Sequence, residues 1–125
     1  MKVIKLPQEI EVWLILPEIR KRLSIYLKKQ GLKQKVVANI LGLTEAAVCQ
    51  YLKGKRAKQD IRFPKSVDKE IEKSAKRLIK DNNLIMCELN RLLKLKEVKK
   101  VTCYLHRKEN TKLIKKCNAC YNENA

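Results

Sequence analysis

The sequence predicts an all-α fold, and its composition and apolar spacing both indicate it. Glycine and proline are scarce, with three residues of each in 125, so the chain has few points at which a helix must end. Between these points, segments of about 10–15 residues carry apolar side chains at helical spacing. There is no internal repeat and no convincing strand pattern, and the one stretch that would suit local pairing is residues 101–105.

The first predicted helix begins near Pro17. Pro7 precedes a short apolar stretch over residues 10–16, and Pro17 suits the first turn of a helix that runs to about Lys29. The pair "QG" at 30–31 ends it. Its inner face is expected to carry the apolar residues Ile19, Leu23, Tyr26 and Leu27.

Two short helices are predicted over residues 34–41 and 45–52. Gly42 ends the first of them, because a left-handed backbone is cheap only for glycine. Thr44 is placed to cap the second by accepting a bond from a free backbone N–H group. The side chains expected on the buried faces are Val37, Ala38, Leu41, Leu43, Ala47, Val48 and Leu52.

The second half of the chain is predicted as a linker and two further helices. The basic stretch "KGKRAKQDIRFPKS", residues 53–66, has the composition of a linker. Helices are expected over residues 67–80 and 84–95, with "DNN" at 81–83 between them. Beyond residue 95 the helical periodicity fades.

The charge of the chain indicates a polyanionic partner. Thirty Lys and Arg residues stand against 13 Asp and Glu, for a formal net charge of +17. This excess favours nucleic acid ahead of an anionic membrane. The alternative is a lysine-rich surface of the kind found in proteins from hot environments, but there glutamate matches lysine in number.

Several classes of protein do not fit the sequence. No apolar run reaches the ~18–20 residues of a membrane span, and a secretory signal is missing, so we expect a cytoplasmic chain without a membrane partner. One histidine, no paired carboxylates, no glycine-rich phosphate loop and no nucleophile motif argue against an enzyme and against a small-molecule substrate.

Residues 32–56, "LKQKVVANILGLTEAAVCQYLKGKR", resemble the helix-turn-helix of the Cro/C1-type (XRE-like) regulators. The flanking "KLPQEIEVWLILPEIRKRL", "CYLHR" and terminal "CNAC" are similar to a group of archaeal predicted transcriptional regulators. The resemblance implies a lambda-repressor-like helix-turn-helix domain over 1–60 and a helical, Cys-rich module over 84–125. Residues 61–83 would then be a basic linker and connecting helix.

The same resemblance implies a set of DNA-binding positions. The residues concerned are Gln34, Thr44, Glu45, Ala46, Gln50, Lys53, Lys55 and Arg56. It makes Gln34 a phosphate contact at a helix N-terminus and places Glu45, Ala46 and Gln50 at base-reading positions beside Thr44. By their chemistry, these three suit cytosine, a thymine methyl group and adenine, respectively. The three cations would hold the backbone. For each lysine the alternative is a solvated surface charge, and for Gln50 an idle surface position.

The five cysteines are expected as thiols or metal ligands rather than disulfides. Cys49 is interpreted as a small, partly buried thiol, with a redox switch as the alternative. The other four suit a Cys₄ zinc or iron–sulfur site, and the last two form a C-x-x-C pair. These residues are Cys87, Cys103, Cys117 and Cys120. The alternative is reduced thiols without a cofactor.

One departure from the resembled group bears on this metal site. Its members often carry cysteine at the positions of Gln8 and Asn90. If their site needs either cysteine, the site is lost or altered here. His106, three residues after Cys103, is a further candidate ligand, and the alternatives are a packing residue or a phosphate contact.

These observations lead to one main functional hypothesis and one alternative. The first is a sequence-specific transcriptional regulator that binds double-stranded DNA as a homodimer and senses redox or iron–sulfur status through its C-terminal cysteines. The alternative is a small basic RNA- or ribosome-binding protein with a structural zinc. Few aromatic residues, 5% of the chain, argue against stacking on single strands.

Overall fold

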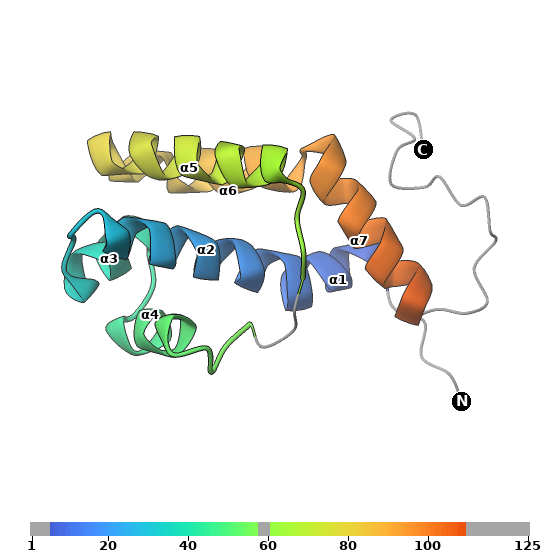
Figure 1. The fold of residues 1–125 in the computed structure, drawn as a ribbon, viewed down its shortest axis with the longest axis horizontal. Helices are drawn as coiled ribbons and strands as arrows, with labels where there is room; N and C mark the ends of the chain where they lie inside the picture. The colour runs from blue at the N-terminus through green and yellow to red at the C-terminus, as the bar shows by residue number, and fades with distance from the viewer. Residues whose placement is uncertain (1–5, 58–60, 110–125) are drawn as a thin grey trace.

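The structure, a computed structural model, describes residues 6–57 and 61–109, and every regular element in these ranges is helical (Figure 1). The all-α prediction is confirmed. In chain order the elements are α1 (Pro7–Ile10), the π-helical η1 (Glu11–Ile15), α2 (Leu16–Lys29), α3 (Gln34–Leu41), α4 (Glu45–Leu52), α5 (Lys65–Lys80), the 3₁₀ turn η2 (Asn82–Leu84), α6 (Ile85–Leu93) and α7 (Lys96–Glu109). Within the described ranges, none of these helices has the length and apolar character needed to cross a membrane.

The N-terminal helix begins ten residues earlier than predicted. It starts at Pro7, and the N–H of Leu6 donates to Glu9 Oε1 at 3.0 Å. The chain then continues through η1 into α2 without a break. Proline inside a helix removes a hydrogen bond and crowds the preceding turn, yet Pro17 is accommodated because the turn before it is π-helical, with the N–H of Leu16 donating to the carbonyl of Glu11.

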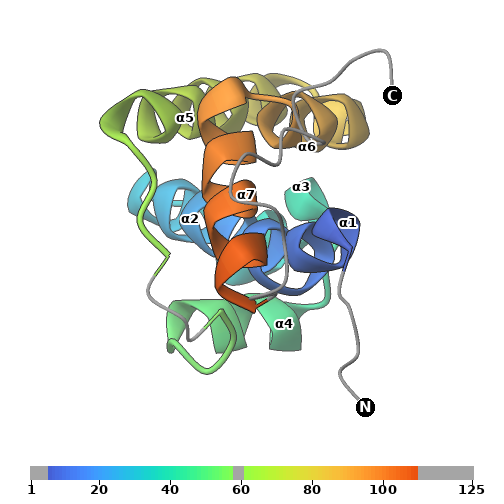
Figure 2. The ribbon, with the colours of Figure 1, turned by 90° about the vertical axis from the view of Figure 1, so that its right-hand side faces the viewer.

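The helices are stacked in layers that α7 connects. Figure 1 shows α5 and α6 side by side above α2, with α4 on the opposite side of α2. Figure 2 shows α7 crossing from the α5–α6 layer to α1, and α7 contacts α1, η1 and α6. The predicted local pairing of residues 101–105 is therefore wrong, because this segment lies inside α7.

One hydrophobic cluster extends through the described residues. Ile19, Leu23 and Leu27 of α2 are fully buried in it, as the sequence predicted. The same cluster contains Leu92 of α6 and Val98 of α7. Segments from the predicted DNA-binding half and the predicted C-terminal module thus share a single core.

The segment between α4 and α5 is more than a linker. Ile61 and Phe63 are both buried in the core. From α2, Arg22 Nη2 donates to the carbonyl of Ile61 at 2.9 Å, and its guanidinium lies 4.9 Å from the ring centroid of Phe63. The prediction of a plain basic linker over 53–66 is wrong at these positions, because two apolar side chains within the basic run fasten it to α2.

Candidate nucleic-acid interface

The helices α3 and α4 have the ends that the sequence predicted. Gly42 adopts a left-handed backbone with φ +66°, and it is followed by a bond from the N–H of Leu43 to the carbonyl of Ala38 at 2.9 Å. The N–H of Ala47 donates to Thr44 Oγ1 at 3.0 Å, which caps α4. The turn residue and the capping residue are therefore confirmed.

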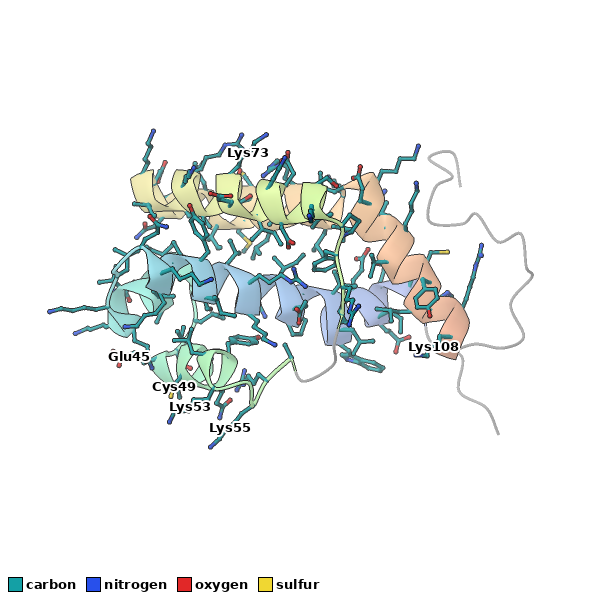
Figure 3. The ribbon with its side chains drawn as sticks, viewed as in Figure 1. Glu45, Cys49, Lys53, Lys55, Lys73 and Lys108 are labelled. Carbon is teal, nitrogen blue, oxygen red and sulfur yellow. The ribbon has the colours of Figure 1, made fainter. Side chains whose placement is uncertain are left out.

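One side of α4 is buried and the other is open. Ala47, Val48 and Tyr51 pack inward, where α4 contacts α2 and α3. Leu43 and Leu52 are partly buried and pack against the same core, so they lie on the inner side as predicted. On the outer side Glu45 and Ala46 are exposed, and Cys49 and Gln50 are half-buried. Figure 3 shows Glu45, Cys49, Lys53 and Lys55 along one outer edge of the molecule.

Gln34 connects the starts of the two helices. It is the first residue of α3, and its side-chain Nε2 donates to the carbonyl of Glu45, the first residue of α4, at 3.2 Å. The side chain is half-buried. This bond fixes the beginning of α4 relative to the beginning of α3, a role that sequence reasoning did not include.

Gln50 and Arg56 form a pair that the sequence analysis did not predict. Arg56 Nε donates to Gln50 Oε1, and the Arg56 guanidinium lies 6.0 Å from the ring centroid of Tyr51. The backbone N–H groups of Lys55 and Arg56 also donate to the carbonyl of Gln50, at 2.8 and 3.3 Å. The signal for this turn was Gly54, whose φ of +71° lets the chain fold back on the end of α4.

The α3–α4 segment and the turn after it carry an excess of positive charge. Residues 33–57 contain five Lys and Arg residues and a single carboxylate, Glu45. Lys53, Lys55 and Arg56 are all exposed. Lys21 Nζ of α2 donates to the carbonyl of Ala57 at 3.4 Å, which holds the end of this basic turn against α2.

The predicted metal ligands lie only partly within the described residues. Cys87 is exposed on α6, while Cys103 is buried on α7, and Cys117 and Cys120 lie outside the described residues. In the part of the chain that the structure describes, no three His, Cys, Asp or Glu residues are grouped as metal ligands. A Cys₄ site therefore stays a prediction.

The left-handed turn at Gly42 allows a direct test of the α3–α4 unit. A Cβ at this position would meet no heavy atom within 4 Å, so the cost of a side chain is backbone strain alone. We expect Gly42→Val to lower the free energy of unfolding by about 1–3 kcal/mol. Gly42→Asn should cost much less, because asparagine tolerates this conformation. Thermal melts of both variants measure the difference, and equal losses would contradict a left-handed residue here.

Within residues 32–56 the structure thus has the two helices, the turn at Gly42 and the cap at Thr44 that the sequence predicts. The overall arrangement of a lambda-repressor-like domain stays a prediction. Comparison of the chain with models of protein families, with curated proteins and with solved structures finds no match.

Proposed function

We propose that this protein is a sequence-specific regulator that binds double-stranded DNA with α4 in the major groove. The supporting observation is the α3–α4 unit itself. Its inner faces are buried, its second helix is capped by Thr44, and the exposed Lys53, Lys55 and Arg56 follow that helix directly. A short helix with a polar open side next to basic residues suits the major groove, with its N-terminal turns at the base edges.

The side chains on the open side divide into positioning and reading groups. Lys53 and Lys55 follow α4 and are exposed, so they suit phosphate contacts that set the register without reading sequence. Gln34 stands at the N-terminus of α3, where N–H groups favour a phosphate. Glu45 and Ala46 lie in the first turn of α4, where they suit a cytosine amino group and a thymine methyl group.

The pairing of Gln50 with Arg56 changes the role proposed for Arg56. A side-chain amide oxygen has two lone pairs, and Arg56 occupies one of them. The amide nitrogen and the second lone pair stay available for an adenine, which needs one donor and one acceptor. Arg56 therefore orients the amide of Gln50 as well as adding positive charge, so it is a positioning residue for base reading.

Substitutions of base-reading and of phosphate-contacting side chains should have different effects on sequence specificity. A preferred duplex is first selected from a random pool, and a scrambled duplex serves as the reference. We expect Gln50→Ala to weaken binding to the preferred duplex by roughly 1–3 kcal/mol and to relax the preference at one base pair. Lys55→Ala should weaken binding to both duplexes alike, and it should reduce the slope of log affinity against log salt concentration by about one. Titrations at two salt concentrations measure both effects.

Arg56→Ala tests the pairing with Gln50. It should relax the preference at the same base pair as Gln50→Ala, and the double variant should lose less than the sum of the two single losses. Equal losses on preferred and scrambled duplexes for Gln50→Ala would overturn the base-reading role. Equal affinity for double-stranded RNA would instead favour an RNA-binding protein.

A homodimer is part of this proposal, because one short reading helix contacts few bases. Dimers of such units read two half-sites about one helical turn apart. Two surfaces carry exposed apolar side chains that suit a second copy, one with Val12 and Trp13 on η1 and one with Met86 on α6. Sedimentation of the free protein and of its complex with the selected duplex measures the number of copies.

A further inference from the structure

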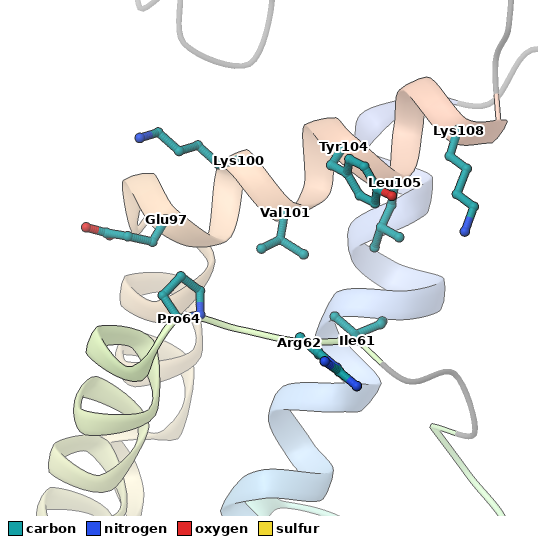
Figure 4. Close-up of a pocket in the computed structure, with 9 residues that line it drawn as sticks. All are labelled: Ile61, Arg62, Pro64, Glu97, Lys100, Val101, Tyr104, Leu105 and Lys108. Atoms are coloured by element: carbon teal, nitrogen blue, oxygen red, sulfur yellow. The ribbon is translucent and has the colours of Figure 1, made fainter.

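A pocket lies between α7 and the segment that leads into α5. Its volume is about 520 Å³, within the range of sites that enclose small organic molecules. Figure 4 shows Val101 and Leu105 of α7 on one side and Ile61 and Pro64 on the other. No residue that the sequence analysis assigned to DNA or metal lines this pocket.

The centre of the pocket is apolar. Val101 and Leu105 are one helical turn apart, so they lie on the same face of α7. The backbone of Ile61 is held against α2, because Arg22 of α2 donates a hydrogen bond to its carbonyl. Tyr104 stands beside them, and 66% of its surface is exposed. Removing water from the apolar side chains that line an open pocket lowers the free energy, so a ligand with an apolar surface is favoured here.

The ends of the pocket differ in charge. Glu97 and Lys100, one turn apart, lie at the end nearest the start of α7. Lys108 lies at the opposite end, and it is four residues after Tyr104 on the same helix face. The lining lysines, Lys100 and Lys108, outnumber the one lining carboxylate, Glu97. The Lys108 end offers an ammonium group and a phenol hydroxyl without a lining carboxylate, so this end favours an anionic group.

We propose that this pocket binds a small organic anion with an apolar body. The body, aromatic or branched aliphatic, fills the space between Val101, Leu105 and Ile61. A carboxylate or sulfonate group at its end accepts hydrogen bonds from Lys108 and Tyr104. The ligand contacts both α7 and the segment that Arg22 holds on α2, so its binding stabilises the packing of these elements. This inference does not depend on DNA binding.

Three probes separate the apolar contribution from the charge. 1-Anilinonaphthalene-8-sulfonate carries an aromatic body and an anion, N-phenyl-1-naphthylamine carries the body alone, and ethanesulfonate carries the charge with little apolar surface. With the full-length chain we expect the first probe to bind saturably at one site, and the second to bind about tenfold more weakly. Ethanesulfonate should not bind at the same concentrations. Methyl spectra should show shifts centred on Ile61, Val101 and Leu105.

Charge reversal at the rim tests the location of the site. Lys108→Glu should lower the affinity for the anionic probe about tenfold or more and leave the affinity for the neutral probe unchanged. Lys80→Glu makes the same change of charge at the far end of α5, sixteen residues and about 24 Å of helix from Pro64, and it should leave both affinities unchanged. Equal losses in the two variants would overturn the proposal. So would binding at many sites, or methyl shifts that do not include Val101 and Leu105.

Discussion

Leu92→Ala is expected to lower the free energy of unfolding of the whole described fold by about 2–5 kcal/mol. Leu92 lies on α6 and is fully buried in the cluster that also contains Leu23 of α2 and Val48 of α4. Removing its side chain leaves a cavity whose lining atoms lose their contacts. Because the cluster is continuous, the loss should affect α3 and α4 as much as α6.

The measurement compares probes at the two ends of the chain. Trp13, the single tryptophan, reports on the N-terminal helix by its fluorescence, and hydrogen exchange of the α4 amides reports on the proposed reading helix. Both should shift to lower stability together with the overall helical signal. Asn90→Ala is the control on the same helix, because Asn90 is exposed and its loss should cost under about 0.5 kcal/mol. A Trp13 midpoint that stays fixed in Leu92→Ala would mean that α6 and α7 unfold separately.

The ends of α3 and α4 were predictable because local chemistry sets them. Gly42 and Thr44 act within one turn of their own position, through a left-handed backbone and a side-chain cap. The predicted helix over 67–80 likewise differs from α5 by only two residues at its start. In each of these segments the apolar residues of the buried face recur at helical spacing, so the pattern and the packing agree.

The helix α7 escaped prediction because its buried face is partly polar. Thr102 and His106 are buried together with Val98 and Cys103. The hydroxyl of Thr102 is satisfied within the helix, since it donates to the carbonyl of Val98 at 3.1 Å. A search for apolar residues therefore misses half of this face. In addition, α7 packs against α1 and η1, which lie some ninety residues earlier in the sequence. A local sequence pattern carries no information about such distant contacts.

The candidate interface was predictable in its residue types but not in its internal bonds. The sequence indicates that Gln34, Gln50 and Arg56 lie near α4. It does not contain the bond from Gln34 to the carbonyl of Glu45 or the bond from Arg56 to Gln50, because both depend on side-chain rotamers and on how the chain turns at Gly54. The pocket at α7 was missed for a similar reason, since its two walls are separated by more than thirty residues.

The second large effect is expected at Glu88, where α5 and α6 share a polar cluster. Glu88 Oε1 accepts a hydrogen bond from the hydroxyl of Ser74 at 2.8 Å and one from Arg77 at 3.2 Å. Arg91 Nε lies 3.4 Å from the same oxygen and its guanidinium also pairs with Glu70. We expect Glu88→Ala to lower the free energy of unfolding by about 2–4 kcal/mol, because it leaves buried donors and positive charge without their acceptor.

Lys76→Ala is the control on α5 for this variant. Lys76 pairs with Glu72 at 3.7 Å, and 64% of the Lys76 side chain is exposed. An exposed pair of this kind contributes between zero and about 1 kcal/mol. Chemical denaturation of the two variants beside the natural protein measures the contrast. Similar losses in both would mean that the polar cluster between α5 and α6 contributes no more than a surface ion pair.

The pH dependence of stability provides an independent check on Glu88. Burial disfavours its ionised form, but the hydrogen bonds from Ser74 and Arg77 and the charges of Arg91 and Arg77 outweigh burial, so the pKa of Glu88 lies below its ordinary value. Near that ordinary value the unfolded chain binds more protons than the folded chain, so the free energy of unfolding increases with pH. The stabilisation is complete above the ordinary pKa and is lost as the pH falls through the lowered one.

Glu88→Gln isolates this contribution, because glutamine can still accept a bond from Ser74 but cannot ionise. Hydrogen bonds from Arg91 and Lys73 also lower the pKa of Glu70, so the natural protein and the variant both lose stability in acid. The informative quantity is therefore the difference in free energy of unfolding between the two proteins. It should be largest at neutral pH and should shrink as the pH falls from 7 towards 3. A difference that stays constant over this range would show that the charge of Glu88 does not stabilise the fold.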